Sequence, residues 1–174
     1  MREPAKVDVK TRNVVAVFDS FAESDAALSA LRQSGVEAQD VSVVGKQPGD
    51  PPEIGARDTH ASRGSAVGAT LGAAIGGLIG LVTLAIPGIG PFVAAGALGS
   101  ALTGAAAGTF TGALVGSFVG LGVPTEHGRR YEQAVRAGAV VLTVQLPDAE
   151  AAARARGLLD QAGARETAVY QPTL

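Results

Sequence analysis

The chain has 174 residues, a formal net charge of −2 and no cysteine. The absence of cysteine excludes disulfide bonds, thiolate metal ligands and a cysteine nucleophile. The near-neutral charge gives no reason to expect a nucleic-acid partner. The first residues (MREPAKVDVKTR) are polar and contain no apolar h-region, so we expect no secretory signal peptide and a cytoplasmic location for this end of the chain.

Charge is distributed unevenly along the chain. Residues 64–125 contain no Asp, Glu, Lys or Arg, and most of the 24 glycines lie in this block. Soluble domains are typically about one-quarter charged, so the block is a compositional boundary. We therefore expect a first soluble part, a Pro/Gly-rich linker, a glycine-rich hairpin and a second soluble part, at residues 13–46, 47–63, 64–123 and 124–172.

The first soluble part predicts a strand, a helix and a strand. Residues 13–18 (NVVAVF) are apolar and rich in β-branched side chains, as in a strand. Ser20 and Glu23 have the spacing of a capping box at the start of a helix. Gly35 stands where that helix should end, and residues 41–44 (VSVV) form the second predicted strand.

The second soluble part predicts the same pattern, preceded by an extra helix over residues 126–137. Residues 139–146 (AVVLTVQL) are the strand. Asp148 is a plausible N-cap of the next helix, and Gly163 ends it. Residues 167–170 (TAVY) form the last short strand.

Together the two βαβ halves predict an α+β protein. Neither half alone is large enough for a stable core. Combined, they would form a four-stranded antiparallel sheet with two helices on one face, which is the ferredoxin-like βαββαβ plan. The central block would then take the place of the connection between strands two and three.

Glycine recurs every fourth residue in the central block, interrupted by residues 87–91 (PGIGP). This period places glycines along one helix stripe and lets two backbones approach closely, as in the small-xxx-small pairs of membrane helices. We predict a hairpin of two helices over residues 65–86 and 92–123. Its helix-packing residues are Gly64, Gly68, Gly72, Gly76, Gly80, Gly96, Gly104, Gly108, Gly112, Gly116 and Gly120.

The length of the hairpin is consistent with a lipid bilayer as a partner. The first predicted helix would span about 33 Å, against about 30 Å for the bilayer core. Both soluble halves must lie on one side of the membrane to share a sheet, so two crossings are needed. The positive-inside rule then places the domain on the cytoplasmic side, with Arg63, Arg129, Arg130 and Tyr131 at the membrane interface. A solvated position for the two neighbouring arginines and a core position for the tyrosine are equally plausible.

The block is only weakly hydrophobic, because Ala, Gly, Ser and Thr make up most of it. The same hairpin could therefore pack into a soluble homo-oligomer, glycine stripe against glycine stripe. The choice between lipid and other copies of the chain stays open at this point.

Two segments resemble a known family. Residues 14–46 (VVAVFDSFAESDAALSALRQSGVEAQDVSVVGK) are similar to the opening of a bacterial general stress protein family that includes heat- and low-temperature-induced proteins. Residues 122–144 (GVPTEHGRRYEQAVRAGAVVLTV) are similar to that family's return into its soluble domain, after a hydrophobic glycine-rich segment. The resemblance covers residues 13–172. It implies a stress-associated bacterial protein and offers no catalytic residues.

Other candidate sites have simpler structural interpretations. Asp19 and Glu23 are better explained by helix capping than by paired-carboxylate chemistry. His60 and His127 are the only histidines, but neither has a carboxylate at ligand spacing, so we expect both to be exposed rather than a metal or pH-sensing pair. Residues 72–77 (GAAIGG) lack the Gly-Lys-Ser/Thr of a phosphate loop. We expect no catalytic, metal or cofactor-binding residues.

Three functions follow from these patterns. The leading hypothesis is a non-enzymatic stress-associated protein, anchored to the cytoplasmic membrane and joined into a homo-oligomer by the glycine hairpin. The second is a soluble, self-assembling particle or filament with the hairpin as its core. The third is a sensor that binds a small ligand or a partner, which rests on fold analogy alone.

Overall fold

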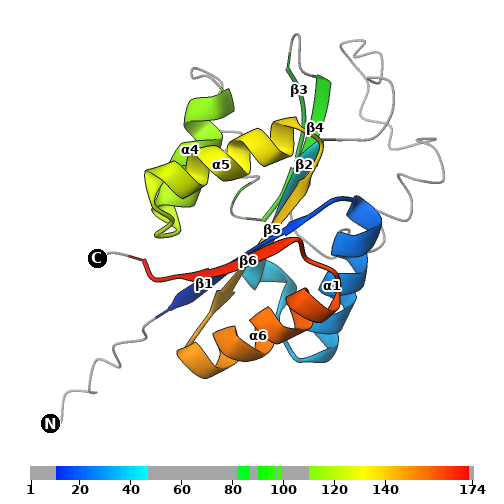
Figure 1. Cartoon of the computed structure of the whole chain (residues 1–174), viewed down its shortest axis with the longest axis vertical. Coiled ribbons are helices and arrows are strands. Elements are labelled where there is room, and N and C mark those ends of the chain that lie inside the picture. The colour runs from blue at the N-terminus through cyan, green and yellow to red at the C-terminus, as the bar shows by residue number, and fades with distance from the viewer. Residues whose placement is uncertain (1–10, 47–81, 87–89, 97, 99–109, 173–174) are drawn as a thin grey trace, which may run out of the picture.

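The computed structural model of the protein describes residues 11–46, 82–86, 90–96, 98 and 110–172. Over these residues the chain is α+β, with an antiparallel sheet between two layers of helices (Figure 1). The first half comprises β1 (Arg12–Phe18), α1 (Phe21–Gln33), the short 3-10 turn Ala38–Asp40 and β2 (Val41–Lys46). The remaining elements are β3 (Val82–Ile86), β4 (Gly90–Ala95), α4 (Phe110–Gly120), α5 (Thr125–Arg136), β5 (Val140–Leu146), α6 (Ala149–Gln161) and β6 (Glu166–Tyr170).

The sheet brings distant parts of the chain together in the order β3-β4-β2-β5-β1-β6. Every pairing is antiparallel. Strand β5 lies between β2 and β1, and in its pairing with β1 Val144 lies opposite Val14. The four strands predicted in the two soluble parts are therefore all present, and they join the two halves into one sheet.

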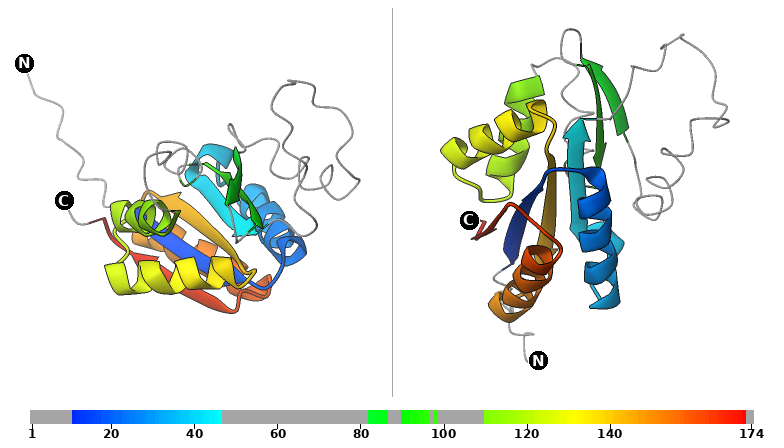
Figure 2. Two further views of the ribbon diagram at one scale, coloured as in Figure 1. Left: turned by 90° about the horizontal axis from the view of Figure 1, so that it is seen from above. Right: turned by 45° about the vertical axis from the view of Figure 1, so that its right-hand side comes forward.

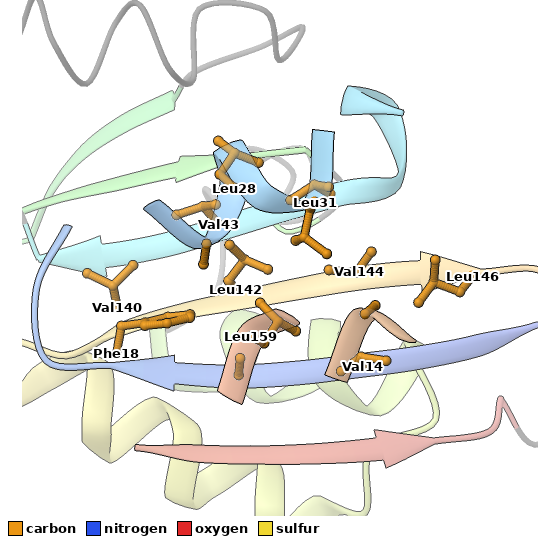
Figure 3. Packing of buried hydrophobic residues seen from close by; sticks show 14 of the residues in the cluster. Val14, Phe18, Leu28, Leu31, Val43, Val140, Leu142, Val144, Leu146 and Leu159 are labelled. Atoms are coloured by element: carbon orange, nitrogen blue, oxygen red, sulfur yellow. The ribbon is translucent and has the colours of Figure 1, made fainter. Parts of the chain in front are cut away.

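The first layer of helices covers one face of this sheet. Val14, Ala16 and Phe18 of β1 point toward α1 and α6, because alternate residues of a strand share a face. Leu159 of α6 lies over β1, whereas Leu28 and Leu31 of α1 lie near Val43 and Val144 of the neighbouring strands (Figure 3). This layer is the one that the periodicity of the two soluble parts predicts.

The second layer covers the opposite face, to which the sequence analysis assigned no helix. Val15 and Val17 of β1 point to this side, where α4 and α5 pack (Figure 2). Leu114 and Phe118 of α4 are fully buried there. The physical reason is that both faces of the central strands are apolar, so a sheet covered on one side would leave the other face in water.

The predicted helical hairpin is wrong at residues 82–86 and 90–95. These two segments form the antiparallel strands β3 and β4, so the last two residues of the segment PGIGP belong to a strand. Two causes favour this outcome. Val82, Thr83 and Ile86 are β-branched, and β2 would otherwise present an unpaired edge, which β4 completes.

Of the helix predicted over residues 92–123, residues 92–95 belong to β4 instead, whereas Phe110–Gly120 form the helix α4. No helix among the described residues combines the length and the apolar character needed to cross a bilayer. The rest of the predicted hairpin, residues 64–81 and 99–109, lies outside the described residues.

Candidate functional site

The side of α4 that points away from the core carries almost no side chains. Gly112, Gly116 and Gly120 are exposed on it. They lie within an arc of about 80° because a step of four residues advances an α-helix by about 40° beyond a full turn. Val119 borders them and is 44% exposed, which is unusual for a large apolar side chain in this structure. We call these four residues the glycine face.

A groove of about 410 Å³ runs beside the glycine face. The residues that line it are mostly small or apolar: Leu98, Gly112, Ala113, Gly116, Ser117, Gly120 and Leu121. A Cβ atom added at Gly116 or Gly120 would meet no atom within 4 Å among the described residues. Packing inside the described domain therefore gives no reason for glycine there, although each costs a helix about 1 kcal/mol relative to alanine.

Gly96 has a different role from the one predicted for it. It is not part of a helix stripe but of a turn after β4, with φ of +74°. A Cβ there would lie 2.4 Å from the carbonyl oxygen of Val41. The close approach to β2 and the left-handed backbone both require glycine. The other predicted zipper residues lie outside the described residues: Gly64, Gly68, Gly72, Gly76, Gly80, Gly104 and Gly108.

The second feature of interest is a group of polar side chains under α5. The hydroxyl oxygens of Tyr131 and Tyr170 are 2.7 Å apart, and Nδ1 of His127 is 2.9 Å from the Tyr170 hydroxyl. Tyr131 is 1% exposed and Tyr170 is 9% exposed. The three side chains thus form a continuous row of hydrogen bonds. It runs from half-buried His127 on α5 to Tyr170 on β6, and from there to buried Tyr131 on α5.

Burial and hydrogen bonding determine the state of Tyr131, and Asn13 lies nearby. Burial raises the pKa of Tyr131 far above its ordinary value, and the hydrogen bond with Tyr170 raises it further, so its phenol stays protonated. Asn13 lies opposite Tyr170 in the β1–β6 pairing and donates from Nδ2 to the carbonyl of Leu121 at 2.6 Å. Its Oδ1 is buried and has no partner among the described residues. We call Asn13, His127, Tyr131 and Tyr170 the tyrosine cluster.

Three of the four residues predicted at a membrane interface are described, and they are consecutive in α5. Tyr131 is in the core, where its ring packs on Phe118 with centroids 5.4 Å apart, so the interfacial prediction for it is wrong and its alternative as a core residue is correct. Arg129 is exposed, and Arg130 forms an exposed ion pair with Glu166. Such pairs contribute little to stability. Arg63 lies outside the described residues.

The capping interpretation of the first carboxylates is confirmed. The Oγ of Ser20 accepts from the backbone N–H of Glu23 at 3.3 Å, and Glu23 accepts in turn from the N–H of Asp19. Asp19 also pairs with Arg165 at 2.8 Å. Within the described residues no group of three acidic or histidine side chains could hold a metal ion.

The prediction for the histidines is wrong in the one case that the structure describes. His127 is half-buried and hydrogen-bonded rather than free in solvent, while His60 lies outside the described residues. The sequence-based predictions did not include Asn13 and Tyr170 among the candidate site residues. Asn13 has the strand parity of Val15 and Val17, which would have indicated burial only if the second helix layer were known.

Comparison with protein-family models, with curated proteins and with solved structures finds no match to this chain. The two features are therefore interpreted from their chemistry. The glycine face offers an uncharged surface on which another helix could approach at backbone distance. The tyrosine cluster offers a buried hydrogen-bond chain that ends on the half-buried imidazole of His127.

Proposed function

We propose that the protein is a non-enzymatic assembly protein whose copies associate through the glycine face of α4. The observation that carries this proposal is the pair Gly116 and Gly120, which are exposed on a helix and have open space where their side chains would be. Their cost to the helix is offset if another backbone packs there. We further assign the strands β2-β5-β1-β6, with α1 and α6, to the ferredoxin-like arrangement, interrupted by the glycine-rich segment between its second and third strands.

The shape of the glycine face supports association with a second copy. Val119 projects beside a flat stripe formed by Gly112, Gly116 and Gly120, so a ridge and a groove lie next to each other on one helix. A two-fold contact could insert the Val119 side chain of each copy over the stripe of the other. No charged residue lies on α4 to oppose such a contact.

The α4 contact alone would be small. A helix of this length is about 16 Å long, and stable interfaces usually bury about 800 Å² on each partner. We therefore propose that the charge-free residues 64–81 and 99–109 extend the assembly, since they carry the remaining glycines of the period-four series. The assembly would serve a stress-associated role, as the family resemblance implies.

A membrane setting is the second candidate. It is favoured by residues 64–81, which contain no charge and would measure about 27 Å as a helix. A single crossing there would separate β2 from β3, whereas both lie in one sheet. Two crossings by the predicted helices would require residues 82–95, which form strands of that sheet. These constraints favour a soluble assembly, or one that touches the cytoplasmic membrane surface, over a spanning hairpin.

Sizing of the purified chain in the absence of detergent tests the proposal. We expect an oligomer that Gly116→Leu and Gly120→Leu each dissociate toward smaller species. Gly157→Leu is the matched control, because Gly157 also lies in a helix, α6, with open space at its Cβ on the other side of the sheet. An oligomer that is unchanged by both α4 substitutions, or a wild-type monomer, would refute the glycine face as the contact. Flotation with anionic vesicles separates the membrane candidate from the soluble one.

A further inference from the structure

The number of donor hydrogens in the tyrosine cluster depends on the protonation of His127. Three atoms share two contacts: Nδ1 of His127, the hydroxyl of Tyr170 and the hydroxyl of Tyr131. A neutral histidine with its proton on Nε2 leaves Nδ1 free to accept. Tyr131 can then donate to Tyr170, and Tyr170 to His127. Both hydroxyl hydrogens are used, and both contacts are formed.

Protonation of His127 leaves more donor hydrogens in the cluster than there are contacts to use them. Nδ1 then becomes a donor, so three donor hydrogens meet at two contacts and one hydroxyl hydrogen is left over. It belongs either to Tyr131 or to Tyr170, and both side chains are more than nine-tenths buried. Neither hydroxyl has a further hydrogen-bond partner among the described residues. A buried donor without an acceptor is strongly disfavoured.

The charged groups around His127 do not compensate for its added charge. On α5 its neighbours are Glu126, Arg129 and Arg130, all exposed, and Arg130 already holds Glu166 of β6. The turn from α4, residues 121–124 (LGVP), contains no titratable group, and α4 itself contains none. β1 contributes the neutral Asn13 and the cation Arg12. Within the described part of the chain His127 forms no ion pair with a carboxylate.

The cluster is also where the second helix layer is attached to the edge of the sheet. His127 and Tyr131 are on α5, whereas Tyr170 is the last residue of β6. The ring of Tyr131 packs on Phe118 of α4 as well, and Asn13 of β1 holds the carbonyl of Leu121 just beyond α4. A change in this cluster therefore affects α4 and α5 together.

We propose that His127 is a proton-sensitive latch, which holds the α4–α5 layer against β6 when neutral and releases it when protonated. The latch makes the second helix layer less stable in mildly acidic solution, while the α1–α6 layer on the opposite face is unaffected. This inference does not depend on the glycine face being an assembly contact.

Urea unfolding of the full chain at pH 7.5 and pH 5.0 tests the latch. The informative variant is His127→Gln, because glutamine can accept from Tyr170 without titrating. We expect acidification to raise the unfolding equilibrium constant of the wild type about tenfold more than that of His127→Gln. The ceiling is about thirtyfold, set by a histidine pKa of about 6.5 in the unfolded chain. His60→Gln is the matched control and should respond to pH as the wild type does. An equal response of the wild type and His127→Gln would overturn the latch.

Two measurements on the folded protein keep the test decisive if His127→Gln does not fold. Nitrogen chemical shifts of the single histidine in His60→Gln report the tautomer, and we expect the Nε2–H form at pH 7.5. Amide exchange, corrected for the intrinsic effect of pH, should show α5 losing protection at pH 5.0 relative to α6. An Nδ1–H tautomer at neutral pH, or equal changes in α5 and α6, would refute the proposal.

Discussion

Replacing Phe118 with alanine tests whether α4 is an integral layer of the folded domain. The Phe118 side chain is 0% exposed and packs against the ring of Tyr131, with centroids 5.4 Å apart. Truncation of a buried phenylalanine removes its transfer free energy and leaves a cavity, which together cost about 3–5 kcal/mol. We expect Phe118→Ala to lower the free energy of unfolding by this amount.

The next residue on the helix provides the control. Val119 is 44% exposed, so at a protein concentration at which the chain is monomeric Val119→Ala should change the free energy of unfolding by less than about 0.5 kcal/mol. Phe18→Ala, on the α1–α6 side of the sheet, should cost as much as Phe118→Ala because Phe18 is equally buried. Phe18→Ala thus gives the cost of truncating a fully buried phenylalanine on the other face, with which Phe118→Ala is compared.

The assay is equilibrium urea unfolding of the full chain, followed by far-ultraviolet circular dichroism. Tyrosine fluorescence adds a local probe, since the chain has two tyrosines and no tryptophan. A Phe118→Ala variant as stable as Val119→Ala would refute the reasoning. It would mean that residues 110–120 do not cover the sheet and that their apolar side chains serve another partner.

Two further predictions concern single residues. The raised pKa of Tyr131 means that its phenol binds a proton more tightly in the folded than in the unfolded chain, so this stabilisation is complete below about pH 10 and is lost at higher pH. Absorbance at 295 nm should therefore show Tyr131 ionising only upon unfolding, whereas an ordinary titration of both tyrosines in the native protein would contradict its burial. Gly96→Ala should lower the thermal midpoint more than Gly35→Ala: both glycines have positive φ, but only at Gly96 would the Cβ collide with backbone. Equal shifts in the two midpoints would show that the contact with Val41 is not rigid.

The two flanking parts of the chain were predictable because their signals are local. Ser20 and Asp148 cap their helices as expected, each accepting from a backbone N–H three residues later. Gly35 and Gly163 follow the helix ends with φ of +91° and +93°. These features depend on neighbours in the sequence, so the sequence alone contains the information needed to place them.

The secondary structure of the central block was predicted less well because the pattern of its apolar residues fits more than one period. Glycine, alanine and valine at residues 82–95 fit a helix stripe and a strand about equally well. The strand was selected by the free edge of β2, whose residues pair with residues of β4 that lie far along the chain, such as Lys46 with Phe92. Only the tertiary structure supplies that edge, since no local signal records which strand will lack a neighbour.

For the two candidate sites, too, some features can be read from the sequence and others depend on the tertiary structure. The period-four glycines at residues 112, 116 and 120 are visible in the sequence, and the sequence by itself determined that they share one face of a helix. The sequence also determined the charge-free block and the order of elements in both soluble parts. The tertiary structure decided that the glycines of α4 point outward, because Leu114 and Phe118 bury the opposite side against the sheet. It also decided that His127 meets Tyr170, since hydrogen bonds between residues far apart in the chain form only after packing has brought their elements together.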